Sequence, residues 1–360
     1  MRASPWRCVL LRAFRVTVVA GALAAGAVVT PAAAQYPIAP SPVLDVGRLP
    51  TALSFSGYVA ARETWRQDST TFSISRIRIT AQAHPLPFLA IRIQGGISNN
   101  DIGSSSPTVG TFAFSDAYLQ LVPPDTMRFR SLRPSLIVGQ FKMPFSLEYL
   151  TPYSHLLTVD RSQAVDGLAL KRDIGVMGQV HLTRYVTVDG AVANGSGANT
   201  TSNPDGREVA MARVTVMPFP QLAIAGKWAG EGGVHRWGYD ARFVAGRAVV
   251  EGEVIQVRDS AGAAVSDASG GYALASYKVL PWLQPVLKWE QFHQTLAATN
   301  PPVVTGVPPV LPETRSTWTT YGVNFNAARD RVRFQLDWVV KSDHSDGRAN
   351  ELLAQVVAIY

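Results

Sequence analysis

The chain has 360 residues, with 33 Lys and Arg against 26 Asp and Glu and a formal net charge of +7. Four of the basic residues lie in the first 34 positions, so the rest of the chain carries only +3 (29 − 26), without a run of Lys or Arg that would favour nucleic-acid binding. The single cysteine is Cys8, which excludes a disulfide framework.

The N-terminus is typical of a secretory signal. Residues 1–15 hold four arginines and no acid, an apolar run follows over 16–29, and 30–34 read Thr-Pro-Ala-Ala-Ala. The apolar run is shorter than the ~20 residues that a membrane-spanning helix needs. We therefore predict a cleaved signal peptide over 1–34, which would also remove the cysteine. A Pro-rich leader over 35–52 and a single domain over 53–360 follow it.

Beyond the leader, runs of about ten residues alternate between apolar and polar side chains. Over 233–244, Trp237, Tyr239 and Phe243 fall on one face, and Asp240 and Arg242 on the other. This is the period of a β-strand. Charges on one face and aromatic residues near the ends of the other are typical of a strand between lipid and water. No run of 18 apolar residues follows the signal, so only a closed barrel could satisfy the backbone in a membrane.

Short and long connections alternate between these runs, as in a barrel with periplasmic turns and extracellular loops. We predict an all-β, antiparallel transmembrane β-barrel of about 16 strands, with strands starting near 53, 72, 88, 112, 135, 173, 185, 207, 221, 235, 247, 271, 283, 317, 331 and 350. The longer outer connections are predicted at 64–70, 98–110, 144–171, 194–206, 230–234, 259–269, 296–314 and 342–349. Sixteen strands leave an aqueous lumen. The last strand alternates to Tyr360, a terminal aromatic that resembles the signal read by the bacterial barrel-assembly machinery.

The third outer loop, 144–171, is the longest. It contains apolar residues that water would not favour, which are Phe145, Leu147, Tyr149, Leu150, Tyr153, Leu156 and Leu157. A loop of this length and composition is expected to fold onto something, and the lumen is the nearest shielded space. The alternative is an outward surface cap. The predicted pore constriction and anion path consist of Lys142, Glu148, His155, Arg161, Lys171 and Arg172.

The inward faces of the other strands supply the predicted lumen lining, which is Arg76, Arg78, Arg92, Asp116, Arg213, Lys227, Arg242, Lys288 and Arg333. Further acids on these faces nearly balance the positive charge. Because rings of Arg or Lys favour anions, we predict a mild anion preference. The alternative is that these charges only keep the lumen wet and pair across strands.

Residues 139–151, Gly-Gln-Phe-Lys-Met-Pro-Phe-Ser-Leu-Glu-Tyr-Leu-Thr, resemble the G-Q-F-K-x-P-F-S-x-E-x-L-T segment of the phosphate-selective porin O and P family. Residues 75–79, 115–118, 160–161 and 172–176 resemble further elements of that family. The resemblance implies a sixteen-stranded, homotrimeric porin that passes small anions. This loop has no lysine between Lys142 and Lys171, and Asp160 stands where the family pattern has Glu, so phosphate selectivity does not carry over.

We therefore predict an outer-membrane porin of a Gram-negative bacterium, passing small anionic or neutral solutes, with phosphate among the candidates. Its partners would be membrane lipid and the assembly machinery, and it would have no cofactor, metal or enzymatic activity. One alternative is a barrel-anchored adhesin or receptor. The other, less favoured, is an outer-membrane hydrolase, since six histidines are present without H-x-x-H or G-x-S-x-G spacing.

Overall fold

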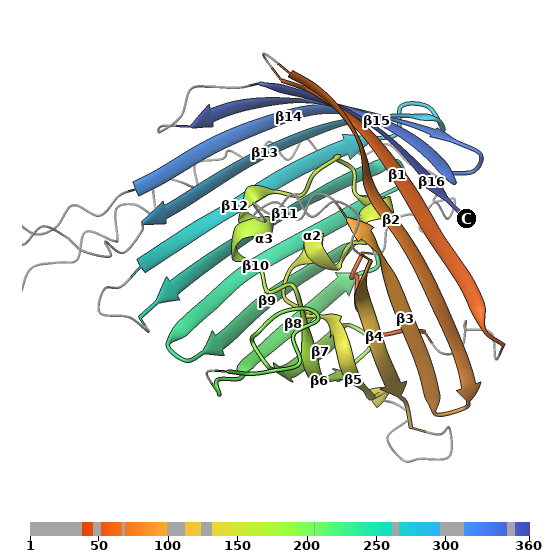
Figure 1. Cartoon of the computed structure of the whole chain (residues 1–360), viewed down its shortest axis with the longest axis vertical. Helices are drawn as coiled ribbons and strands as arrows, with labels where there is room; N and C mark the ends of the chain where they lie inside the picture. Colours follow the sequence, from red (N-terminus) through yellow and green to blue (C-terminus); the bar gives the residue numbers. More distant parts are fainter. Residues whose placement is uncertain are drawn as a thin grey trace, which may run out of the picture.

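The computed structural model describes residues 38–45, 52–66, 69–98, 112–123, 132–204, 206–260, 266–295, 313–343 and 350–360. Within these ranges, sixteen strands form one closed antiparallel barrel in which each strand pairs with its neighbours in the chain and β1 pairs with β16 (Figure 1). The predicted fold class is confirmed. The predicted signal peptide and much of the leader lie outside the described residues, as do most of the outer loops predicted at 98–110, 296–314 and 342–349.

The first eight strands are β1 Ser54–Arg66, β2 Ser69–Leu86, β3 Leu89–Ser98, β4 Ala113–Leu121, β5 Ser135–Lys142, β6 Arg172–His181, β7 Val186–Ala193 and β8 Val209–Phe219. The other eight are β9 Leu222–Glu231, β10 Val234–Ala245, β11 Ala248–Asp259, β12 Ser266–Tyr277, β13 Leu283–Thr295, β14 Glu313–Ala327, β15 Val332–Asp343 and β16 Glu351–Ile359. The predicted starts agree closely, and the largest difference is five residues, at β12.

Side chains alternate between the lumen and the outside along each strand. On β8, Arg213 and Thr215 are buried inside, whereas Val214 and Val216 are exposed outside. Exposed aromatic rings lie near both ends of the strands, with Trp282 stacked on Phe325 near the short turns and Tyr321 against Trp338 farther along. An apolar exterior with aromatic girdles is the surface that a barrel presents to lipid. No helix among the described residues is long and apolar enough to cross a membrane.

Barrel closure depends on a close approach at the C-terminus. Gly57 and Tyr360 exchange two backbone hydrogen bonds of 3.2 and 3.1 Å. A Cβ atom at Gly57 would collide with the Tyr360 ring and with the Arg78 carbonyl oxygen. Glycine at this position therefore lets the last residue complete the seam between β1 and β16.

Two predicted outer loops are wrong because the strands run farther than the alternation suggested. Residues 64–70 are mostly strand, since β1 continues to Arg66 and β2 starts at Ser69. The loop predicted at 230–234 is a two-residue turn in which Gly232 and Gly233 have φ angles of 52° and 105°. Positive φ angles at both central residues suit the tight turn of a β-hairpin.

The third outer loop folds inward, as predicted. It connects Lys142 of β5 with Arg172 of β6 and contains three short helical segments, α2 Leu147–Leu150, η3 Tyr153–His155 and α3 Gln163–Leu168. These segments lie within the barrel (Figure 1). We refer to residues 143–171 as the inner loop.

Candidate functional site

The inner loop owes its local shape to two serine caps. Ser146 precedes α2 and its side chain accepts a hydrogen bond from the Tyr149 amide. Ser162 precedes α3 and accepts from the Val165 amide in the same way. Serine at this position satisfies an amide that the first helical turn leaves without a partner.

Apolar side chains bury one face of the inner loop against the barrel wall. Phe145, Leu147 and Val165 are at most 1% exposed, and Phe145 and Val165 belong to the same buried cluster as Ile255 and Leu274 of the wall. Helix α3 comes so near β12 that a Cβ atom at Gly270 would lie 2.8 Å from the Cβ atom of Ala164. Burial of this apolar area is the main force that keeps the loop inside.

Side chains of the wall also hold the loop by its backbone carbonyls. Arg213 donates to the Phe145 oxygen at 3.0 Å, Arg333 to the Leu156 oxygen at 3.0 Å, and Lys288 to the Asp160 oxygen at 2.9 Å. Asn324 donates to the Leu157 oxygen, and the Val159 amide donates to Asp337 at 2.7 Å. These anchors come from β8, β13, β14 and β15. Arg62 of β1 adds an ion pair with Asp160 at 2.6 Å, so the loop extends from that wall across to β1.

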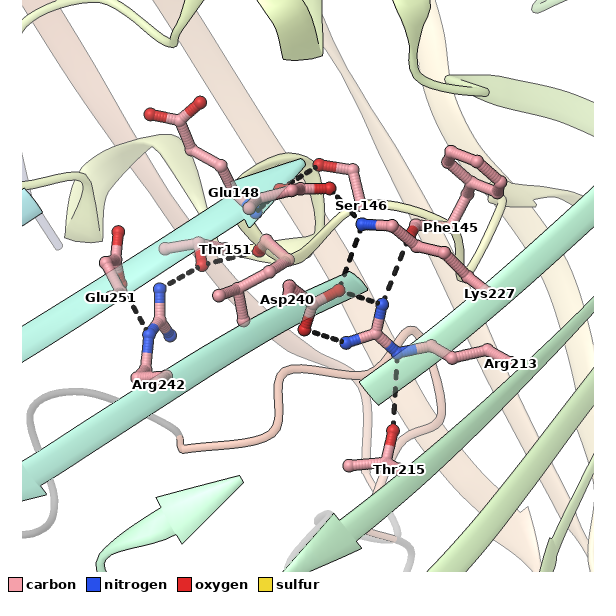
Figure 2. Close-up of polar contacts among 12 residues, drawn as sticks. Phe145, Ser146, Glu148, Thr151, Arg213, Thr215, Lys227, Asp240, Arg242 and Glu251 are labelled. Carbon is pink, nitrogen blue, oxygen red and sulfur yellow. Dashed lines mark hydrogen bonds and ion pairs between the residues drawn. The ribbon is translucent and has the colours of Figure 1, made fainter. Parts of the chain in front are cut away.

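A buried ion-pair network lies behind the start of the loop (Figure 2). Asp240 accepts from Arg213 at 2.7 and 2.8 Å and from Lys227 at 3.0 Å. Lys227 also pairs with Glu253, whose carboxylate accepts hydrogen bonds from the Ser146 side chain and the Glu148 amide. The network thus joins β8, β9, β10 and β11 to the loop.

Five predicted lumen cations therefore point inward but lie beneath the loop. Each is at most 5% exposed, and together they are Arg213, Lys227, Arg242, Lys288 and Arg333. They pair with wall carboxylates or donate to loop oxygens, as Arg242 does with Glu251 at 2.6 Å. Their role in this arrangement is to hold the loop in place.

A second group of cations lies on the opposite side, where the loop leaves the wall. We call Arg92, Lys142, Arg161 and Arg172, with Asp116 and Tyr149, the cationic cluster. Asp116 bridges Arg92 and Arg172 at 3.1 and 2.8 Å. The Tyr149 ring centroid lies 5.0 Å from Arg161, 5.4 Å from Lys142 and 5.7 Å from Arg172.

The cluster brings together three of the six predicted constriction residues, Lys142, Arg161 and Arg172. Lys142 donates to the carbonyl oxygens of Tyr149 and Leu150, and Arg161 to those of Glu148 and Thr151, so the loop fixes both. Beside the cluster, Arg76 stacks 4.0 Å from the Tyr153 ring, and Arg78 donates to the Ile77 carbonyl oxygen.

The other three predicted constriction residues are not part of the cluster. Glu148 points under the loop toward Lys288, 3.8 Å away, and Lys171 is bonded by its backbone oxygen to the Met143 amide. His155 contacts Ser154 at 3.1 Å, and burial lowers the pKa of its ring to about 4. The ring is therefore neutral at neutral pH and adds no charge to the path.

Sequence reasoning missed Tyr149 and Tyr153, which it treated only as apolar loop residues. Each presents its ring to at least one cation and its hydroxyl to a hydrogen-bond partner, Arg172 for Tyr149 and Gln355 for Tyr153. The signal was available, because tyrosines in a loop flanked by several cations are natural cation–π partners.

Glu148 makes stability depend on pH. Burial raises its pKa to about 7, with Lys288, the Ser162 amide and Arg161 lowering it and Glu251 raising it. Because the folded protein holds this proton more tightly than the unfolded chain, its contribution is full below about pH 4.5 and is lost as pH rises through about 7. A Glu148→Gln variant is expected to abolish this part of the pH dependence of thermal unfolding between about pH 4.5 and pH 8. An unchanged profile would contradict the assignment.

Comparisons with known proteins agree with this architecture. Residues 97–221 match the family model described as phosphate-selective porin O and P, which confirms the resemblance over this part of the chain. No curated protein sequence matches the chain.

Solved structures of outer-membrane porins share the fold. A trimer form of OmpT from Vibrio cholerae aligns with a TM-score of 0.58 at 13% identity, covering 86% of this chain and 99% of that one. The channel DcaP of Acinetobacter baumannii aligns at 0.60 and 11%, covering 86% and 97%. An anion-selective porin from Comamonas acidovorans aligns at 0.54 and 12%, covering 86% and 99%. The predicted outer-membrane location is confirmed by the barrel and the family model together.

Proposed function

We propose that this outer-membrane porin passes small solutes by passive diffusion with a preference for anions, and that the cationic cluster is its selective point. The observation that carries the proposal is the local balance of charge. Asp116 pairs with the guanidinium groups of Arg92 and Arg172, and a third guanidinium, that of Arg161, lies 5.0 Å from the Tyr149 ring centroid, so these four groups carry +2 (3 − 1). A ring of positive side chains in a narrow passage favours anions.

The position of the inner loop supports the same passage. The loop covers the inward cations between β8 and β15, and Arg62, Arg76 and Arg78 of β1 and β2 are buried too, so a solute would meet the more exposed cations next to β3, β4 and β6. The side chains of Arg92 and Arg172 are 23% and 15% exposed, whereas those of Arg213 and Arg242 are 3% exposed. The preference would be mild, because a single cluster attracts anions at one point. A row of exposed cations would attract them along the whole lumen.

The rival functions receive less support. An adhesin would present its longest loop to the outside, and here that loop is buried within the barrel. A hydrolase would need a histidine paired with a nucleophile and an acid. His155 contacts Ser154 at 3.1 Å and His181 contacts Thr187 at 3.0 Å, and neither of these described contacts involves an acid. The family model and the porin fold both favour a channel without enzymatic activity.

Planar-bilayer recordings in a potassium chloride gradient test the proposal. We expect a reversal potential whose sign indicates that chloride is more permeant than potassium, because the cluster is positive. Replacing chloride by phosphate would then show whether phosphate is favoured. Insertion in groups of three equal steps is expected if the chain forms a homotrimer, as OmpT of Vibrio cholerae does in its trimer form. A closed barrel without conductance would exclude the porin function, and cation selectivity would exclude the anion preference alone.

A further inference from the structure

Part of the N-terminal leader lies inside the barrel. Residues 38–45 run along the inner wall of β4 and β6, near the short turns. The Tyr118 hydroxyl donates to the Pro42 carbonyl oxygen at 2.6 Å, and Gln179 donates to the Ser41 hydroxyl at 3.0 Å. Val43 and Leu44 pack against the large buried apolar cluster. We call residues 38–45 the leader segment.

Gln120 recognises the backbone of the leader segment. Its side-chain oxygen accepts from the Leu44 amide at 2.7 Å, and its side-chain nitrogen donates to the Leu44 carbonyl oxygen at 2.9 Å. The Gln120 side chain is fully buried. The Gln120 side-chain amide thus satisfies both backbone groups of Leu44, as the backbone of a paired strand would. The segment itself forms no strand.

The leader segment lies directly below the cationic cluster. Asp116, Tyr118 and Gln120 are successive inward residues of β4, and such residues are about 7 Å apart along a strand. Asp116 belongs to the cluster, and the next two hold the segment. The wall anchors of the inner loop run from β8 round to β16 and β1, whereas those of the leader segment are on β4 and β6.

A cavity of about 780 Å³ lies between the leader segment and the wall of β7 and β8. Its lining includes Ile38, Pro40, Gln179, Thr187 and Met217. Tyr185 and Pro220 of the short turns also line it, so the cavity lies beside the segment at the periplasmic end of the lumen. The segment therefore narrows the periplasmic mouth. Side chains of the wall hold it, so these contacts can break without the loss of any hydrogen bond between the strands of the barrel.

We propose that the leader segment is a periplasmic gate in series with the inner loop, closed when Gln120, Tyr118 and Gln179 hold it and open when it leaves the wall. The proposal goes beyond the proposed function, and it concerns access to the mouth from the periplasm and not ion selectivity.

Thiol accessibility tests the gate without any need for current. Thr187 lines the cavity, and the single native cysteine, Cys8, lies in the predicted signal peptide. A Thr187→Cys variant is labelled with a membrane-impermeant thiol reagent from the periplasmic side, with and without deletion of residues 38–45. If the segment is closed for about nine-tenths of the time, we expect the deletion to raise the labelling rate about tenfold.

Substitutions on the wall keep the test valid where the deletion fails to assemble. Gln120→Ala and Tyr118→Phe remove contacts with the segment and should each raise the labelling rate in the Thr187→Cys background. Gln335→Ala is the matched control, because Gln335 is an equally buried inward glutamine on β15 that contacts Leu156 and Gln355. A crosslink provides a second test, in which a short bifunctional thiol reagent joins Ser41→Cys to Gln179→Cys and holds the segment on the wall. The crosslink should prevent polymers from entering the pore from the periplasmic side. Entry of polymers from the extracellular side should be unchanged.

Equal labelling rates in the wild-type background, the deletion and the Gln120→Ala variant would overturn the gate, whatever the ion selectivity. Equal acceleration by Gln335→Ala would also overturn it, since the effect would then come from a general loosening of the barrel. A channel that is not anion-selective but shows faster labelling after deletion would retain the gate and reject only the anion preference.

Discussion

An Asp240→Ala variant should lose about 3–5 kcal/mol of unfolding free energy, the usual cost of removing one partner from a buried ion pair. Asp240 accepts two hydrogen bonds from Arg213 and one from Lys227, and all three side chains are at most 3% exposed. Lys227 keeps Glu253, so the stranded charge is that of Arg213. Urea unfolding in lipid vesicles measures the loss.

The same variant should loosen the inner loop. Arg213 also donates to the Phe145 carbonyl oxygen, so a displaced guanidinium would release the start of the loop. We expect larger and more variable single-channel currents than in the wild type. Arg66→Ala is the control: Arg66 pairs with Glu351 at 2.6 Å but is 60% exposed, and such surface pairs contribute only about 0–1 kcal/mol. Equal losses in both variants would contradict the anchoring role of the network.

Substitutions in the cationic cluster should change ion selectivity in opposite directions. A unit charge about 6 Å from a permeating ion in water contributes about 0.7 kcal/mol, with opposite signs for chloride and potassium, so it changes their permeability ratio by about 1.4 kcal/mol, or about tenfold. Arg161→Gln should therefore lower the chloride-to-potassium ratio about tenfold, and Asp116→Asn should raise it by a similar factor. Glutamine can still donate to the Glu148 and Thr151 oxygens that Arg161 contacts, so the loop should stay in place.

Reversal potentials of the two variants provide the measurement, and Arg236→Gln provides the control. Arg236 lies at the far end of β10 and pairs with Glu231 at 3.8 Å. At about 0.1 M salt its field is screened within about 10 Å, so the control should leave the ratio unchanged. If Arg161→Gln and Asp116→Asn shift the ratio in the same direction, or not at all, the cluster is not the selective point.

The strands were predictable because lipid on one side and water on the other impose a regular alternation of apolar and polar side chains. The inward direction of the loop was predictable too, since Phe145, Leu147 and Leu157 had to be buried somewhere. Which cations the loop would cover was not predictable. Arg213 and Arg92 look alike in the sequence, both being charged residues on the inward face of a strand. The two arginines differ because a carbonyl oxygen of the loop, that of Phe145, reaches Arg213, whereas Arg92 contacts Asp116.

The leader escaped prediction for a related reason. Gln120 and Tyr118 bind the backbone of residues 42 and 44, and backbone groups leave no trace in a sequence. A Pro-rich segment between a signal peptide and a first strand looks like a linker. Its burial depends on a neighbouring strand that lies more than 70 residues farther along the chain.

The anchoring of the inner loop also constrains the order of assembly. Val159 binds Asp337, 178 positions later, and Tyr153 binds Gln355, 202 positions later. The loop is therefore synthesised and exported before most of the strands that hold it. Until β16 is in place, the apolar face of the loop is not fully buried, so a periplasmic chaperone would have to cover it. Docking of the loop then becomes a late step that follows, or accompanies, the joining of the first and last strands.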